Sequence, residues 1–451
     1  MYFIIALFIL FLIAFGALFY HFFKYRFISF IRHERTDDMG PFPLEGYTNK
    51  YFYYEGEEIS FHLRSEFTAN TGIITKVGHD ENIHQFTFGT ILQDIPETAS
   101  AKGCHWDTTI KLAVDDSFSS GYYRCRLTSE SSSEPFDIYF IIGKHEAAEI
   151  VIVAPVSTWT AYNPWGGQSL YQNVHQDKTT YHVSTERPNT AFHLNHDIEA
   201  EANIFNWFSK EYPDVAIITD IALGTNPQLL DNCKLLVLAY HVEYVTREMY
   251  TAIERVLGNG ASLISLGANQ CYWLVRWNGD HSVMECRKDL TAFDKSLEYG
   301  GMWKHHLRLP EQLFGVGYSG SGMHTFAPYE VTNASHWLYE GLTVKNGDLF
   351  GMSGVTSKPI SGAETDKVTR YSGEVEKIAQ GLNCLDETQG TIYNEDRTIW
   401  NGSGGGDFVL KHRSKTSAIL STASIQSGSG LGYDSIFTGI IKNFIKRYLG
   451  K

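Results

Sequence analysis

The sequence predicts an α/β fold: a parallel sheet flanked by helices follows a β-sandwich, and one apolar helix precedes both. Between residues 149 and 267, continuous apolar runs alternate with amphipathic segments, as strands and helices do in parallel α/β folds. Residues 50–143 carry short β-type segments separated by turn residues. The expected parts are a membrane helix, a linker, a β-sandwich domain and an α/β domain, at residues 1–23, 24–47, 48–145 and 146–451.

The first 23 residues carry no formally charged side chain. As a helix they reach roughly 34 Å, which is enough to cross a bilayer. A signal peptide is the competing interpretation, but the basic n-region and a small-residue cleavage site are missing. Basic residues follow the segment at Lys24, Arg26, Arg32 and Arg35, so the positive-inside rule predicts a single-pass protein with its other domains on the cytoplasmic (or matrix) side. The sequons at Asn333 and Asn401 weakly favour the opposite side.

Composition narrows the function classes. The formal charge of −14 argues against nucleic-acid binding, because no part of the chain supplies a basic face. The six cysteines are scattered, with neither zinc-type pairs nor the pattern of a disulfide framework.

The expected strands of the sandwich contain aromatic and β-branched residues and follow one another without a helical period. They lie within residues 51–66, 86–92, 105–114, 121–130 and 136–143. The expected buried strands of the α/β domain are residues 149–155, 215–220, 234–240 and 261–267, with helices over 197–212 and 246–257 between them. Thr246 marks the start of the second helix.

Three loops follow strands of the predicted sheet. They are residues 158–171 (TWTAYNPWGGQSLY), the HVEY segment at 241–244, and residues 267–277 (GANQCYWLVRW). Ligands of open α/β sheets bind at the carboxyl ends of the strands, where these loops emerge. Each also has a plain structural explanation, since Asn269 can satisfy loop backbone groups and Glu243 can assist a helix start. Their convergence is what indicates a site.

The strand-loop-helix layout is similar to class I glutamine-amidotransferase-like domains. Those enzymes need a nucleophilic Cys on a sharp turn after a strand. Cys233 precedes its strand and Cys271 lies beyond the expected position, so this chemistry is disfavoured.

The three loops together resemble the C-terminal catalytic region of the N,N-dimethylformamidase large (beta) subunit family. Further matching pieces lie at 120–123 (SGYY), 186–188 (ERP), 334–337 (ASHW), 362–366 (GAETD) and 423–430 (ASIQSGSG). The resemblance extends from about residue 110 to the C-terminus.

The resemblance implies a mononuclear ferric iron, Fe(III), held by Tyr123, Tyr162 and Glu243. Phenolate and carboxylate oxygens suit this hard cation. His241 is then the neighbouring proton-transfer group, Asn269 orients substrate or water, and Glu364 is the candidate general base. Tyr122 adjoins Tyr123, and alternation along a strand lets only one of them face a site.

The expected function is hydrolysis of a small, uncharged amide or a related C–N bond by a metal-activated water. The expected pocket lining is aromatic: Trp165, Tyr272, Trp273 and Trp337. The family motif usually reads His-Asp-Glu-Tyr-Trp, whereas Val242 and Val245 stand here. The alternative function is therefore an accessory or structural subunit of a membrane protein complex, and the expected partners are such a complex or a second copy of the chain.

Overall fold

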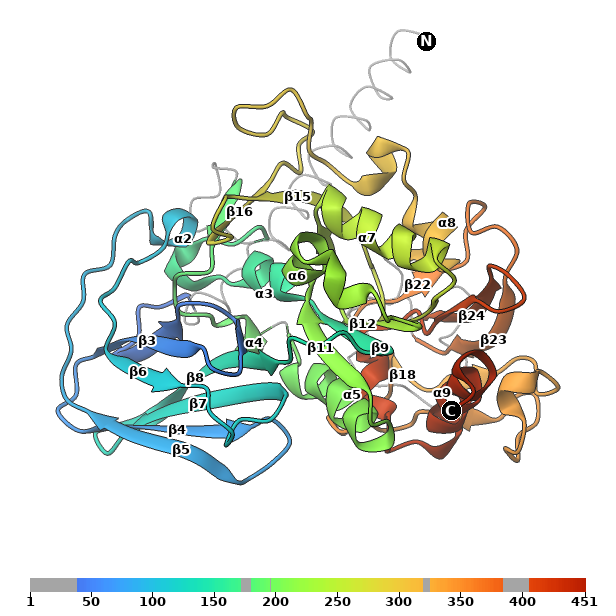
Figure 1. Ribbon diagram of the computed structural model, residues 1–451, viewed down its shortest axis with the longest axis horizontal. Coiled ribbons are helices and arrows are strands. Elements are labelled where there is room, and N and C mark those ends of the chain that lie inside the picture. Colours follow the sequence, from blue (N-terminus) through green and yellow to red (C-terminus); the bar gives the residue numbers. More distant parts are fainter. Residues whose placement is uncertain (1–38, 172–179, 195, 319–324, 384–404) are drawn as a thin grey trace, which may run out of the picture.

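The computed structural model describes residues 39–171, 180–194, 196–318, 325–383 and 405–451. Two sheets built from residues 44–143 share one apolar core (Figure 1). Inward residues alternate along β3, so that Ile59, Phe61 and Leu63 are fully buried. One sheet has the order β1 (Leu44–Thr48), β3 (Glu58–Ser65), β6 (Ile110–Ala113). The other has the order β2 (Phe52–Tyr54), β8 (Ser132–Gly143), β7 (Gly121–Ser129), β4 (Asn70–Lys76), β5 (Asn82–Phe88).

A nine-stranded mixed sheet forms the centre of the molecule. Its first five strands are parallel: β11 (Val215–Thr219), β9 (Ile150–Ala154), β12 (Leu235–Tyr240), β14 (Ser262–Gly267) and β25 (Ala418–Ser421). Its remaining strands pair antiparallel: β24 (Asp407–His412), β23 (Glu376–Gly381), β19 (Tyr329–Val331) and β20 (Leu349–Phe350). Every residue of β9, β12 and β14 is buried, which explains their continuous apolar sequences.

Helices cover both faces of the parallel part. α5 (Ile198–Glu211) and α9 (Ser435–Leu449) pack on one face, while α6 (Asp220–Thr225) and α7 (Arg247–Gly258) pack on the other (Figure 1). The predicted start of α7 is confirmed, because the Thr246 side chain accepts a hydrogen bond from the Met249 backbone N–H. Shorter helical elements are α2 (Ala99–Lys102), α3 (Val156–Tyr162), α4 (Ala191–Leu194), α8 (Pro310–Phe314), and 3₁₀ turns at Trp165–Gly167, Pro227–Leu230, Trp303–His306, Trp337–Tyr339 and Ile425–Gly430.

The predicted fold class, one parallel sheet similar to glutamine-amidotransferase-like domains, is wrong. The described residues form six sheets, and most strand pairings are antiparallel. A four-stranded sheet has the order β10 (His182–Ser184), β16 (Val283–Cys286), β15 (Trp273–Trp277), β13 (Tyr244–Val245), and two small ones pair β17 (Gly317–Tyr318) with β22 (Asp366–Lys367) and β18 (Phe326–Ala327) with β21 (Ser361–Gly362). Many of these strands are two to six residues long, too short to show a period, and tertiary contacts select their pairing.

The predicted membrane helix, residues 1–23, lies outside the described residues. In the part of the chain that the structure describes, no helix combines the length and apolar character needed to cross a membrane. The described residues therefore give no support to the predicted single-pass membrane location.

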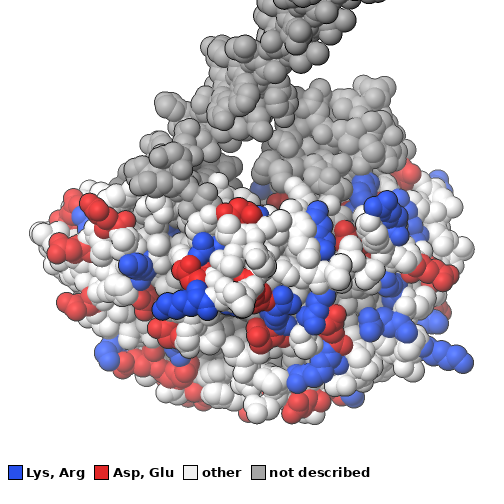
Figure 2. Space-filling model, turned by 90° about the horizontal axis from the view of Figure 1, so that it is seen from above, with Lys and Arg blue, Asp and Glu red and all other residues white. Residues whose placement is uncertain are grey.

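Acidic and basic side chains intermix on the described part of the face seen in Figure 2. This face therefore presents no extended field of one sign to a charged partner.

Candidate functional site

The three loops singled out in the sequence meet at one edge of the central sheet, as predicted. β9, β12 and β14 are neighbours and parallel, so their carboxyl ends lie together. The Thr158 hydroxyl donates to the His241 carbonyl oxygen at 2.6 Å and accepts from the Glu243 backbone N–H at 3.2 Å. The third loop joins through the Gln270 side chain, whose oxygen accepts from the Val242 backbone N–H at 2.7 Å.

The strands end in sharp backbone turns. Tyr240, Asn269 and Cys271 have φ values of 57°, 53° and 54°, in the left-handed region that side chains other than Gly rarely adopt. Strained residues of this kind gather at functional sites, where surrounding structure holds them. Here they place the polar residues His241 and Asn269 at the sheet edge.

Glu243 is the centre of the site, and only 1% of its surface is exposed. Its Oε2 accepts a hydrogen bond from the Tyr162 hydroxyl at 3.0 Å, and its Oε1 accepts one from the Tyr171 hydroxyl at 2.6 Å. The two phenol rings stack with centroids 4.5 Å apart. Two phenols and one carboxylate therefore converge.

His241 lies against the same oxygens. Its Nε2 is 3.0 Å from the Tyr162 hydroxyl and 3.1 Å from Glu243 Oε2, and its Nδ1–H donates to the Ala268 carbonyl oxygen at 2.9 Å. Burial opposes the charged imidazole, but the carboxylates of Glu364 and Glu243 raise the pKa of His241 to about 9.

The side chain of Asn269 contacts two carboxylates, those of Glu364 and Glu243. Its Nδ2 donates to Glu364 Oε2 at 3.1 Å and lies 3.4 Å from Glu243 Oε1. Burial and the charge of Glu243 raise the pKa of Glu364. Burial acts on Glu243 in the same direction, but the hydrogen bond and charge of His241 lower the pKa of Glu243 below its ordinary value. Two carboxyl groups whose pKa values are driven apart are suited to different roles in one reaction.

Two residues of the site were missed in the sequence. Tyr171 was the last residue of a loop singled out there, yet its hydroxyl was given no role. Lys288 is half-buried, its Nζ donates to the Tyr244 hydroxyl at 2.9 Å, and the same atom lies 3.7 Å from the Tyr171 ring centroid. Burial lowers its pKa. In the segment CRKDL nothing separates Lys288 from a surface lysine, so no sequence signal could have found it.

Tyr123, the third predicted ligand, is not brought to this cluster. Its ring stacks on Phe140 inside the sandwich core, with centroids 5.6 Å apart, and its hydroxyl donates to the Ser119 carbonyl oxygen at 2.6 Å. Tyr122 faces the opposite way, toward Trp159. The expected alternation holds, but neither hydroxyl contacts Glu243.

The predicted aromatic lining is only partly present. Trp165 lies beneath the sandwich, where its Nε1–H donates to Glu45 Oε2 at 2.7 Å. Trp337 packs against Tyr448 of α9, with ring centroids 6.2 Å apart. Tyr272 does line a pocket. Trp165 and Trp337 were placed at the site because aromatic loop residues were assumed to face it, whereas they complete separate cores. Trp273 packs against the core that contains Tyr244, and Lys288 Nζ lies 4.7 Å from its ring centroid.

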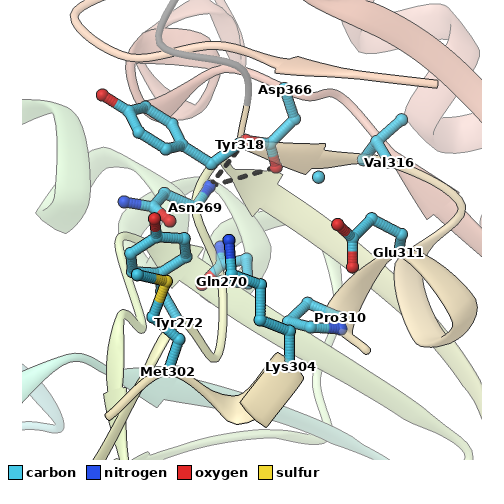
Figure 3. A pocket seen from close by; sticks show the side chains of 11 residues that line it. Asn269, Gln270, Tyr272, Met302, Lys304, Pro310, Glu311, Val316, Tyr318 and Asp366 are labelled. Atoms are coloured by element: carbon cyan, nitrogen blue, oxygen red, sulfur yellow. Dashed lines mark hydrogen bonds between the residues drawn. The ribbon is translucent and has the colours of Figure 1, made fainter. Parts of the chain in front are cut away.

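That pocket adjoins Asn269 and measures about 50 Å³. Figure 3 shows Asn269, Tyr272, Tyr318 and Glu311 around it, with the Asn269 backbone N–H donating to both oxygens of Asp366 at 3.0 Å. Room of this size accommodates about four water-sized groups. The wall combines two tyrosine rings with polar side chains and contains no tryptophan among the described residues.

The loop that carries both site tyrosines is fixed by one buried arginine. Arg187 has no exposed surface, and its guanidinium donates only to carbonyl oxygens: Asn163 at 3.0 Å, Gln168 at 3.0 Å, Ser184 at 3.1 Å, and Trp165. Burial lowers its pKa to about 10. The ERP segment of the sequence is thus the anchor of residues 163–168.

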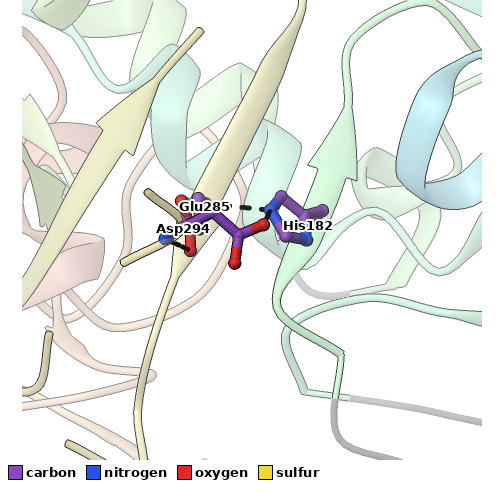
Figure 4. Close-up of side chains that lie close together, drawn as sticks. All are labelled: His182, Glu285 and Asp294. Carbon is purple, nitrogen blue, oxygen red and sulfur yellow. Dashed lines mark hydrogen bonds and ion pairs between the residues drawn. The ribbon is translucent and has the colours of Figure 1, made fainter. Parts of the chain in front are cut away.

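A second group could in principle hold a metal. His182, Glu285 and Asp294 lie close together in the described part of the chain (Figure 4). However, Arg287 donates to Glu285 Oε1 at 2.6 Å and also to Asp294. The guanidinium of Arg287 already pairs with both carboxylates, so we describe the group as an ion-pair cluster.

The two positions that depart from the family motif lie in an apolar core and not among the polar side chains of the site. Val242 and Val245 are fully buried in the apolar core that packs beneath α7. The valines that replace the usual acid and tryptophan therefore belong to the core, and Glu243 keeps its polar partners.

Comparison with known proteins places the chain in a family. Residues 72–438 match the family model described as "N,N-dimethylformamidase beta subunit-like, C-terminal". The N,N-dimethylformamidase beta subunit of Alcaligenes sp is 21% identical, over 77% of this chain and 54% of that protein. The chain thus spans about half the length of this relative. Among solved structures, a family 123 glycoside hydrolase from Clostridium perfringens is 7% identical, covers 52% of this chain and 47% of that one, and has a TM-score of 0.11, which carries no argument.

Proposed function

The chain belongs to the N,N-dimethylformamidase beta subunit-like family, and on this premise we propose that it hydrolyses the C–N bond of a small amide. The observation that supports this most is the convergence of two tyrosine hydroxyls, His241 and Asn269 on the buried carboxylate of Glu243.

We propose further that Tyr162, Tyr171 and Glu243 hold a mononuclear ferric iron. The fit rests on donor chemistry, because phenol and carboxylate oxygens are the ligands that a hard trivalent cation prefers. Desolvation of the hydroxyl groups, followed by the charge of Glu243, raises the pKa of both tyrosines, although 46% of the Tyr171 surface is exposed. A bound cation would reverse this shift by stabilising the phenolates. When bound, the ion supplies Lewis acidity toward an amide carbonyl and lowers the pKa of a bound water.

The remaining polar residues then divide the proton transfers. Glu364, whose pKa is raised by burial and by the charge of Glu243, accepts a proton from the attacking water and returns it to the departing amine. Asn269 contacts both carboxylates and orients the substrate. His241, fixed through its Nδ1–H by the Ala268 carbonyl oxygen, keeps Nε2 directed at Tyr162 and Glu243 and stabilises their charges.

The experiment is metal analysis, visible absorption and an amide hydrolysis assay on the purified chain. We expect stoichiometric iron with a tyrosinate-to-iron charge-transfer band, and formate release from a formamide. Glu243→Ala should lose iron and activity together. Tyr171→Phe should lose the charge-transfer band or shift it. Tyr123→Phe is the matched control in the sandwich core, and it should keep the iron and the band.

Two results would contradict this proposal. If Tyr123→Phe removed the iron and Tyr171→Phe did not, the ligand set would be wrong. If the wild-type chain held no iron and hydrolysed no amide, the accessory-subunit function would be favoured. The name of the Alcaligenes relative, a beta subunit, fits assembly with another subunit.

A further inference from the structure

The pocket beside Asn269 presents hydrogen-bond acceptors that have no donor. The Asn269 Nδ2 group is committed to Glu364 and Glu243, so the orientation of the amide is fixed by two carboxylates. The Asn269 Oδ1 atom is consequently left as an acceptor, and it is buried without a partner among the described residues. Only 5% of the Asn269 surface is exposed.

A second acceptor lies across the pocket. Glu311 Oε2 is buried and likewise without a partner in the described part of the chain. Gly317 makes room for this side chain, because a Cβ there would stand 2.4 Å from Glu311 Cγ. The pocket lining also includes a buried donor without a partner among the described residues, Gln270 Nε2, since the oxygen of that amide accepts from the Val242 N–H.

Buried acceptors need donors from whatever fills the pocket. Leaving one buried acceptor unpaired costs about 1–3 kcal/mol. A primary amide carries two N–H donors and a carbonyl acceptor, which matches the two free acceptors and the free donor of Gln270. A secondary amide carries one N–H donor and pairs one of the two acceptors. A tertiary amide carries no N–H, so it leaves both acceptors unpaired. Sites built to hydrogen-bond a group reject analogues that lack it.

We propose that this pocket selects amides that bear an N–H, primary or secondary, over N,N-dialkyl amides, with Asn269 Oδ1 and Glu311 Oε2 accepting the N–H groups. The inference rests on the proposed amide hydrolysis and names its substrate class. Asn269 contacts the catalytic carboxylates, whereas Glu311 acts on substrate preference alone.

The test uses formamide, N-methylformamide and N,N-dimethylformamide with the iron-loaded full chain, because all three release formate and share one assay. We expect kcat/KM for formamide and N-methylformamide to exceed that for N,N-dimethylformamide by at least about 10-fold. Glu311→Leu should raise KM for the two N–H amides about 10-fold and leave the tertiary amide unchanged or improved. Gln312→Leu, an exposed neighbour on α8, is the matched control and should keep the wild-type preference.

Binding of the three amides is measured in parallel by ligand-observed NMR titration. This measurement distinguishes a failure of the substrate preference from a failure of the proposed hydrolysis. Equal or better turnover or binding of the tertiary amide would overturn the inference, and so would an unchanged preference in Glu311→Leu. If no amide were hydrolysed, the proposed function would fail, and the binding ratio of formamide to N,N-dimethylformamide would still decide this inference.

Discussion

Arg187→Met tests whether one buried guanidinium holds the loop that carries the site tyrosines. The substitution keeps a long apolar stem but removes four hydrogen bonds to carbonyl oxygens. At about 1.5 kcal/mol for each bond from a charged donor, the loss is about 6 kcal/mol. Removing the guanidinium charge also removes the cost of burying it. The fall of the Arg187 pKa to about 10 corresponds to a cost of about 3 kcal/mol. The net expectation is a loss of about 3 kcal/mol in the free energy of unfolding.

The assay is urea unfolding followed by far-UV circular dichroism, together with iron content. Arg187→Met should shift the unfolding midpoint to lower urea and reduce iron retention, since residues 163–168 lie between Tyr162 and Tyr171. Arg187→Lys should also be destabilised, because one ammonium cannot reach carbonyls in all four directions. Arg255→Met, which loses only an exposed contact to the Pro227 carbonyl oxygen, is the control. An Arg187→Met midpoint equal to that of Arg255→Met would refute the reasoning.

Glu364→Gln should keep the iron and its absorption band but lose at least about 100-fold in kcat, because the amide cannot exchange the proton; undiminished kcat would remove Glu364 from the mechanism. Glu45 is fully buried, and burial raises its pKa from 4.5 to about 7. The folded state therefore holds a proton that the unfolded state loses, so this group lowers the free energy of unfolding by about 3 kcal/mol as pH rises from 4.5 to 7, with no further change above. Glu45→Gln should lack this fall when urea unfolding is compared at pH 5 and pH 8, and an unchanged pH slope would contradict the assignment.

The central part of the site was predictable because its strands are buried on both faces. Continuous apolar runs identified β9, β12 and β14, and parallel strands bring their carboxyl ends to one edge. That argument placed Tyr162, His241, Glu243 and Asn269 near one another, and the structure does the same. This prediction did not require the order of the three strands in the sheet, because all parallel strands end at the same edge.

The contributions from outside this edge could not be derived in the same way. Alternation predicted that Tyr122 and Tyr123 face opposite sides, but not that Tyr123 would complete the sandwich core. Lys288 reaches the site from the loop after β16, and its burial depends on three surrounding aromatic rings. The antiparallel strands β24, β23, β19 and β20 are short and gain their conformation from pairing, which a local pattern does not record.

The pairing of β25 with β14 has a consequence for how the protein is made. Leu263 lies opposite Ile419, although 156 residues separate them in the chain. At roughly 5–20 residues per second, a ribosome needs roughly 8–30 s to synthesise that interval. Throughout this time β14, a strand whose residues are all buried in the folded protein, has an unpaired edge of the kind that recruits other chains. We therefore expect that the edge of β14 needs protection until residue 418 has been synthesised. A ribosome that stalls before this point would leave an incomplete sheet with an exposed edge, which favours aggregation, and not a smaller folded unit.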